Sequence, residues 1–130
     1  MEDLTMFVTQ FVDEGNEKAD QLEENLIHLE KNPAAGEVLK EAFRALHSIK
    51  GATSFLNFTK LGALAHSGET LLARLQKGEL VLTPEITSVL LSLVDAIRQI
   101  LGEIAATGKE GDGHHETLES ALARLQKGHA

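Results

Sequence analysis

Residues 46–51 read Leu-His-Ser-Ile-Lys-Gly and bring a titratable ring, a cation and a glycine together within an amphipathic helical pattern. On a helix, Lys50 shares the face of His47, and Gly51 stands one turn above the ring. His47 is turned by about 100° from the apolar Leu46, to the edge of the buried stripe or beyond it. A glycine in a helix interior costs about 1 kcal/mol relative to alanine, so its position beside this ring needs a reason.

His66 and Glu69 form a second polar set, three residues apart on one face of the next predicted helix. Gly62 lies on the same face, four residues before His66. Two helices that are joined by a short turn pack as antiparallel neighbours. The two polar faces are then expected to meet, so that His47 and Lys50 join His66 and Glu69 in one cluster on the surface of the bundle.

Such a cluster has the parts of a nucleophilic site. A carboxylate that accepts the N–H of one imidazole nitrogen fixes the tautomer and leaves the other nitrogen with a free lone pair. An ordinary histidine, with a pKa of about 6.5, is mostly uncharged at neutral pH and can act as a nucleophile. Glu69 is suited to hold His47 in this way. Lys50 and His66 could offer positive charge or hydrogen-bond donors to a phosphoryl group, and Gly51 would leave room for a partner to reach the ring.

Each of these residues also has a plainer interpretation. His47 alone would be an ordinary surface residue on a helix. His66 and Glu69 could be a common surface pair within one helix, and Lys50 a solvated charge. Gly51 could simply allow two helices to pack closely.

Other candidate chemistries have weaker support. Ser48 is turned by about 100° from the histidine before it, and nothing nearby activates its hydroxyl. His114 and His115 lie in a glycine-rich acidic loop and could bind a metal ion only adventitiously. A di-metal carboxylate bundle needs Glu-x-x-His on two helices, whereas this chain has the reverse order, from His66 to Glu69. A helical module that binds a partner's helix remains a rival, although it would not explain a bare glycine beside a charged histidine pair.

Apolar residues at spacings of three and four predict five helices, over about residues 3–30, 34–54, 60–77, 84–107 and 116–127. Their predicted inward positions are Leu4, Phe7, Phe11, Leu22, Leu26 and Leu29; Leu39, Ala42, Leu46, Ile49 and Thr53; Leu61, Leu64, Gly68, Leu71 and Leu75; Ile86, Leu90, Leu93, Ile97, Ile100 and Ile104; and Leu118, Ala121, Leu122 and Leu125.

Capping and breaking residues set the predicted boundaries. Pro33 ends the first helix and is placed to open the second. The segment Phe-Leu-Asn-Phe is the next turn, with Thr59 as the N-cap that follows it. Gly78 is the predicted stop of the third helix, and Thr83 followed by Pro84 is a cap with a first-turn proline.

Short connections favour antiparallel neighbours, so the predicted fold is all-α, an up-and-down antiparallel four-helix bundle with an additional short C-terminal fifth helix. The loop at residues 107–115 separates the fourth helix from the fifth. A length of 130 residues suggests one domain.

Composition excludes several classes of function. The chain has no cysteine, which rules out disulfides and thiolate chemistry and is compatible with a reducing cytoplasm. It has no run of 18 apolar residues, and its first residues are acidic, which argues against a membrane span and a secretory signal. A net charge of −8 would repel a phosphate backbone, and the chain has no Trp or Tyr and only five Phe for base stacking. Nucleic acid is therefore not an expected partner.

The segment LHSIKGATSFLNF, followed by LAHSGETLLARLQKGEL, resembles the histidine phosphotransfer (HPt) domain family. More narrowly, it is similar to the amino-terminal phosphotransfer domains of CheA chemotaxis kinases. The resemblance spans the whole chain, and the second histidine follows the first by 19 residues.

The resemblance implies a role for each matched residue. His47 would be the phosphorylated residue, and Glu69 would hydrogen-bond to it and orient it. Lys50 and His66 would flank the phosphoryl group, and Gly51 would give receiver domains access to the ring.

The resemblance also implies partners. A separate ATP-binding kinase domain would phosphorylate the histidine, and an aspartate of a response-regulator receiver would accept the phosphoryl group. The domain would be a phosphoacceptor and donor without catalytic activity or a cofactor of its own. ATP and Mg²⁺ are expected from the kinase domain, and Mg²⁺ from the receiver. We expect residues 1–130 to be one cytoplasmic, monomeric domain cut from the amino-terminal end of a larger kinase, with a free-standing phosphotransfer protein as the alternative.

Overall fold

Five α-helices form the part of the chain that the computed structural model describes, residues 2–128, and no strand occurs there. They are α1 (Glu2–Lys31), α2 (Gly36–Leu56), α3 (Thr59–Gln76), α4 (Pro84–Thr107) and α5 (Glu116–Gln126).

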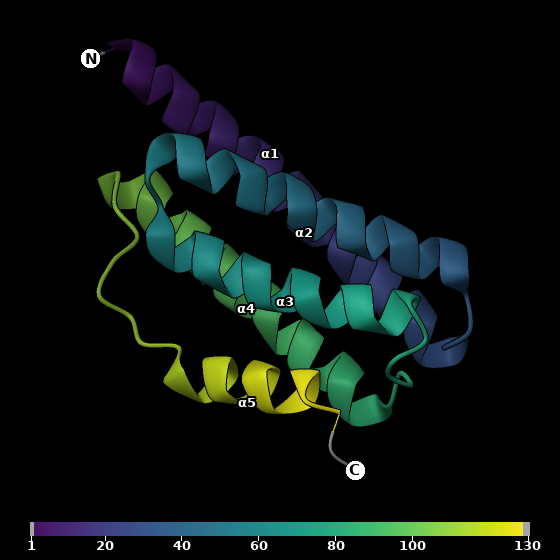
Figure 1. Cartoon of the computed structure of the whole chain (residues 1–130). Helices are drawn as coiled ribbons and strands as arrows, with labels where there is room; N and C mark the ends of the chain where they lie inside the picture. The colour runs from purple at the N-terminus through teal and green to yellow at the C-terminus, as the bar shows by residue number, and fades with distance from the viewer. Residues whose placement is uncertain (1, 129–130) are drawn as a thin grey trace.

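The first four helices run alternately up and down the bundle (Figure 1). α1 packs between α2 and α4, and α3 packs against α2 and α4. The short α5 lies across α3 and α4, outside the four-helix core (Figure 1). The all-α fold predicted from the sequence is confirmed, including the additional C-terminal helix.

The predicted apolar stripes form most of the bundle core. Every predicted inward residue of α2, α3 and α4 is buried, as are Phe11, Leu22, Leu26 and Leu29 of α1. On α5, Leu122 and Leu125 are buried and Leu118 packs against the core. Burial of these stripes leaves the polar faces of α2 and α3 at the surface, beside the line where the two helices meet.

Phe7 is exposed although it was predicted to lie in the core, and Ala121 of α5 is only half-buried. The side chain of Phe7 is 49% exposed, and its ring meets Phe55 edge to face with centroids 5.7 Å apart. The first turns of α1 project beyond the end of α2, away from the packed centre of the bundle (Figure 1). The prediction that Phe7 is buried was therefore wrong. The side chain of Leu4 lies outside the described residues.

The boundaries of α2 also differ from the prediction. The backbone N–H of Ala35 donates to the carbonyl of Asn32 at 3.1 Å, which closes a turn around Pro33. Pro33 therefore lies in the connection and does not open α2, which begins at Gly36. The helix continues through Phe55 and Leu56, two residues that were predicted to form a turn. It ends at Asn57, whose left-handed backbone has a φ of 66°.

The amino terminus of α3 is capped from a distant part of the chain. Phe58 occupies the N-cap position without a side-chain bond, so the prediction of Thr59 as the cap was wrong. The carboxylate of Glu110 accepts the backbone N–H groups of Lys60 at 3.2 Å and Leu61 at 2.6 Å. The Lys60 ammonium in turn donates to two carbonyl oxygens of the same loop, each at 2.8 Å. A carboxylate at this end also complements the helix dipole, so the loop before α5 fixes the start of α3.

Two other predicted boundaries are confirmed. Thr83 caps α4 by accepting the N–H of Ile86 at 3.2 Å, with Pro84 as the first helical residue. Gly78 follows the end of α3 with a φ of +76°, which favours glycine.

Candidate functional site

The antiparallel packing of α2 on α3 brings the two predicted polar faces together. One carboxylate oxygen of Glu69, Oε2, is hydrogen-bonded to His47 Nδ1. The other oxygen, Oε1, accepts a hydrogen bond of 2.7 Å from the Lys50 ammonium. His66 Nδ1 lies 3.8 Å from the same Oε1, beyond hydrogen-bonding distance. The predicted cluster is therefore present, with Glu69 at its centre.

Glu69 is buried, whereas the groups around it reach the surface. Its side chain is 10% exposed, compared with 63% for His47 and 65% for His66. Burial raises the pKa of this carboxyl group, but hydrogen bonds and charge from Lys50 and His47 outweigh the burial, so its pKa lies below the ordinary value. Glu69 is thus a buried carboxylate that stays ionised at neutral pH. The interpretation of His66 and Glu69 as a surface pair within α3 is wrong, because the bonds of Glu69 cross to α2.

The contact with Glu69 decides which nitrogen of His47 is available. An ionised carboxylate can only accept, so the proton of the neutral ring sits on Nδ1. Nε2 then carries the free lone pair. The ring nitrogen with the free lone pair is therefore the one farther from Glu69.

Phe43 orients the same ring and was not singled out in the sequence. It lies one turn before His47 on α2, and its ring is stacked on the imidazole with centroids 6.0 Å apart and an interplanar angle of 13°. The spacing of four residues between Phe43 and His47 places both rings on one face of a helix, and this spacing could have indicated the contact. Glu69 and Phe43 together restrict both the rotation and the tilt of the imidazole.

Lys50 and Gly51 complete the surface around the ring. Lys50 is 30% exposed and bonded to Glu69, so it is not simply a solvated charge. A Cβ atom built on Gly51 would meet nothing within 4 Å, other than its own helix and neighbours. Gly51 therefore does not serve close helix packing, and the space above His47 is open.

The remaining polar candidates lie elsewhere. Ser48 is exposed and lines a small hollow between α1 and α2, together with Lys18. His114 is exposed and His115 half-buried, in the loop before α5. Among the described side chains, those of residues 5–128, no group of three or more His, Cys, Asp or Glu residues is placed to hold a metal ion. In the same range, no helix is both long and apolar enough to cross a membrane.

Comparison with known families identifies this arrangement. The model of the Hpt domain matches residues 6–100, which include α2, α3 and the whole polar cluster. The chain belongs to the Hpt domain family. Hpt domains are phosphotransfer modules within histidine kinases and are not themselves catalysts.

Similar proteins of known sequence are chemotaxis kinases. The Hpt chain is 38% identical over 127 residues to the sensor histidine kinase CheAY of Helicobacter pylori, covering 97% of this chain and 16% of that protein. It is 33% identical over 121 residues to the chemotaxis protein CheA of Halobacterium salinarum, covering 93% of this chain and 18% of the relative. The chain thus spans less than a fifth of the length of these relatives.

Solved structures agree with this assignment. The phosphorylated P1 domain of CheA3 from R. sphaeroides, in complex with CheY6, aligns with a TM-score of 0.88 and 26% identity, covering 94% of this chain and 96% of that one. The histidine phosphotransfer domain of CheA aligns with a TM-score of 0.84 and 29% identity, covering 92% and 91%. The chain is an Hpt domain of the CheA type, as the sequence motifs predicted.

Proposed function

We propose that His47 of this Hpt domain is phosphorylated on Nε2 by an ATP-dependent histidine kinase domain and passes the phosphoryl group to an aspartate of a response-regulator receiver. The observation that carries the proposal is the buried, ionised Glu69, which is bonded through one oxygen to His47 Nδ1 and through the other to Lys50. This arrangement leaves Nε2 with a free lone pair on a largely exposed ring.

In the forward step, the Nε2 lone pair attacks the γ-phosphorus of ATP. An N–P bond forms, and the bond to the ADP oxygen breaks, with its electron pair leaving on ADP. The ring, which still carries its Nδ1 proton, gains positive charge, and the carboxylate of Glu69 stabilises that charge. In the second step, a carboxylate oxygen of the receiver attacks phosphorus, and the electron pair of the N–P bond returns to Nε2.

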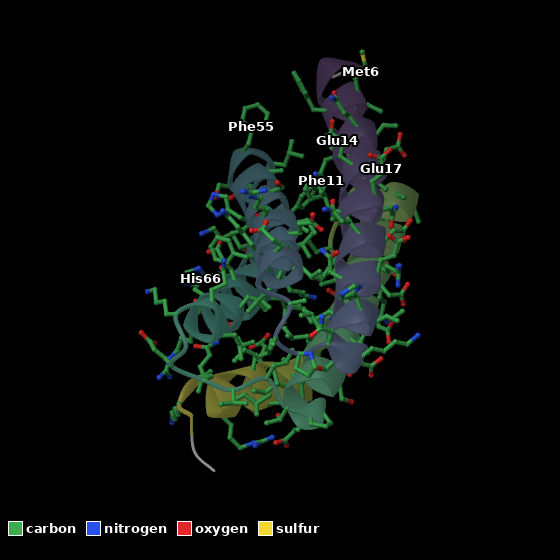
Figure 2. The ribbon with its side chains drawn as sticks, turned by 90° about the vertical axis from the view of Figure 1, so that its right-hand side faces the viewer. Met6, Phe11, Glu14, Glu17, Phe55 and His66 are labelled. Atoms are coloured by element: carbon green, nitrogen blue, oxygen red, sulfur yellow. The ribbon has the colours of Figure 1, made fainter. Side chains whose placement is uncertain are left out.

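Lys50 and His66 are placed to flank the phosphoryl group. Lys50 has three N–H donors, and its bond to Glu69 uses one of them. His66 is 65% exposed and points away from the bundle on the outer side of α3 (Figure 2). Both groups can therefore turn toward negative oxygens that arrive at the neighbouring ring.

The receiver is proposed to dock along α2. Gly51 and Phe55 follow His47 at intervals of four residues, so all three share one face of the helix. Phe55 is 74% exposed, and Met6 of α1 adds exposed apolar surface at the same end of the bundle (Figure 2). Phe7, whose ring meets Phe55, is also exposed there. An apolar patch beside a reactive group is typical of a protein-binding surface. The complex of the similar CheA3 domain with CheY6 supports a receiver as the partner.

The proposal also covers the protein to which this domain belongs and the domains that bind ATP and Mg²⁺. ATP and Mg²⁺ would be bound by the kinase domain, and Mg²⁺ by the receiver. Residues 1–130 would form the Hpt domain of a longer cytoplasmic kinase, with a free-standing phosphotransfer protein as the alternative. The similarity to parts of much longer kinases supports the first arrangement.

Phosphorylation tests this function directly. Incubation with a CheA kinase domain, Mg²⁺ and γ-labelled ATP should label the chain through a bond that is labile to acid and stable to base. Adding a receiver domain should then remove the label from this chain and place it on the receiver. An unlabelled chain would contradict the proposal and favour a purely structural helical module, and an acid-stable label would assign the phosphate to a hydroxyl group instead.

Gly51→Gln should slow phosphotransfer to the receiver at least tenfold, because the new side chain would fill the open space above the ring. The melting temperature should hold or rise, because a glycine is removed from a helix. Single-turnover transfer from the phosphorylated domain measures the rate. Gly102→Gln is the matched control, since a Cβ there also meets nothing within 4 Å but lies on α4. Equal transfer rates for the two variants would exclude Gly51 from partner access.

A further inference from the structure

Two glycines of α3 differ from Gly51 because they lie against neighbouring helices. A Cβ built on Gly62 would lie 2.7 Å from Thr53 Oγ1 on α2. A Cβ built on Gly68 would lie 2.8 Å from Leu46 Cδ1 and would also collide with Leu93 of α4. A distance under 3 Å is too short for a real Cβ contact, so either substitution requires a neighbour or a helix to move.

At Gly68, α3 approaches α2 at the same height along the bundle as the polar cluster. Gly68 directly precedes Glu69, and its neighbour Leu46 directly precedes His47. The contact between Gly68 and Leu46 therefore fixes the distance between the two backbones at the point where the carboxylate reaches across to the ring. Leu46 is fully buried, so it has little freedom to yield.

The close approach at Gly62 is connected to the third member of the cluster. Thr53 is 3% exposed, and its hydroxyl donates to the backbone carbonyl of Lys50 at 2.6 Å. A β-branched side chain that is held in this way has few alternative rotamers. A side chain at position 62 would therefore either displace α3 or break this hydrogen bond of Thr53.

We propose that Gly62 and Gly68 are positioning residues, which set the separation of α2 and α3 so that the one carboxylate of Glu69 reaches both His47 and Lys50. The inference rests on the proposed role of Glu69 and deepens it. A glycine weakens a helix relative to alanine, and the close packing of α2 and α3 explains why glycine occupies these two positions.

Gly62→Ala tests the proposal, with two readouts that an effect on stability alone would not change. The ¹⁵N chemical shifts of the His47 ring report whether Nδ1 still holds the proton that bonds to Glu69. The rate of phosphorylation by a CheA kinase domain reports the reactivity of Nε2. We expect loss of the Nδ1–H tautomer signature and phosphorylation slowed about tenfold, by misplacement of the carboxylate.

A second substitution that makes room for the new side chain should restore the site. Thr53→Ala removes the atom that a Cβ at position 62 would strike, so the double variant Thr53→Ala with Gly62→Ala should recover the ring signature and the rate. Thr53→Ala alone should keep both. Gly102→Ala is the matched glycine control and should leave both readouts unchanged, since a Cβ there meets nothing within 4 Å.

The outcomes separate this proposal from the proposed function. Unchanged ring shifts and rate in folded Gly62→Ala would overturn the positioning role, even if the melting temperature falls. If Gly62→Ala does not fold, the double variant decides: a folded protein with the original ring signature supports the proposal, and a folded protein without it overturns the proposal. Failure of the unsubstituted domain to accept phosphate would contradict the proposed function, while the ring shifts would still test the spacing.

Discussion

His47→Gln should abolish phosphorylation of the domain while its helix content and melting temperature stay within experimental error of the unsubstituted protein. Glutamine has no nucleophilic nitrogen, because the lone pair of an amide nitrogen is delocalised into the carbonyl. The amide can still donate a hydrogen bond to Glu69, so the buried carboxylate keeps two partners. The side chain of His47 is 63% exposed, so the substitution removes little from the core. Labelling with a CheA kinase domain and γ-labelled ATP measures the first effect, and circular dichroism measures the second.

Ser48→Ala is the matched control for this experiment. It removes the adjacent exposed hydroxyl and should leave labelling unchanged. A label that survives His47→Gln, or that disappears with Ser48→Ala, would move the phosphorylated position away from His47.

Glu69→Gln should reduce the rate of phosphorylation about 10²-fold, the size of effect seen when one preorganised electrostatic partner is removed from a reacting group. The substitution keeps the shape of the side chain but removes the charge that holds the proton on Nδ1 and stabilises the phosphorylated ring. Single-turnover labelling measures the effect. Glu41→Gln, an exposed carboxylate-to-amide change on α2, should leave the rate unchanged. Equal rates for the two variants would remove Glu69 from the reaction.

Comparing Glu69→Gln with the unsubstituted domain should also show how the charge of Glu69 contributes to the free energy of unfolding. The folded domain holds the pKa of this carboxyl group below its unfolded value, which is about 4.3 for glutamate. Such a group stabilises the fold above the unfolded pKa, and this contribution disappears as the pH falls through the folded pKa. The free energy of unfolding of the unsubstituted domain should therefore fall toward that of Glu69→Gln as the pH decreases below about 4. A difference that is independent of pH would show that folding leaves the pKa of this carboxyl group unchanged, and a difference that increases as the pH falls would show that its pKa is raised in the folded domain.

The site was predictable from sequence because its parts obey local rules. Helical spacing places Lys50 on the face of His47 and Glu69 near His66, and a short turn makes the two helices antiparallel neighbours. The different environments of the residues within the cluster were harder to predict from the sequence. The burial of Glu69, its two hydrogen bonds to α2 and the clearance around Gly51 depend on how closely the helices approach. Hydrophobic periodicity carries no information about that distance.

Long-range contacts account for most of the remaining differences. The cap of α3 comes from Glu110, 50 residues after Lys60, so no local pattern could indicate it. Phe7 fits the apolar period of α1, but the period does not say where the helix runs past its neighbours. Pro33 has the residue type of a helix start, yet the turn closed by Ala35 determines its position.

The open surface at Gly51 also bears on the lifetime of the phosphorylated state. Water reaches an exposed ring by the same route as a protein partner, so this side of the domain does not protect an N–P bond from hydrolysis. How long the phosphoryl group persists on the free domain would then depend on the bond itself and on the proton held at Nδ1. Exclusion of water at the moment of transfer would fall to the docked partner, whose surface covers the gap. The free domain would thus hold the phosphoryl group exposed to water, and only a docked partner would shield it.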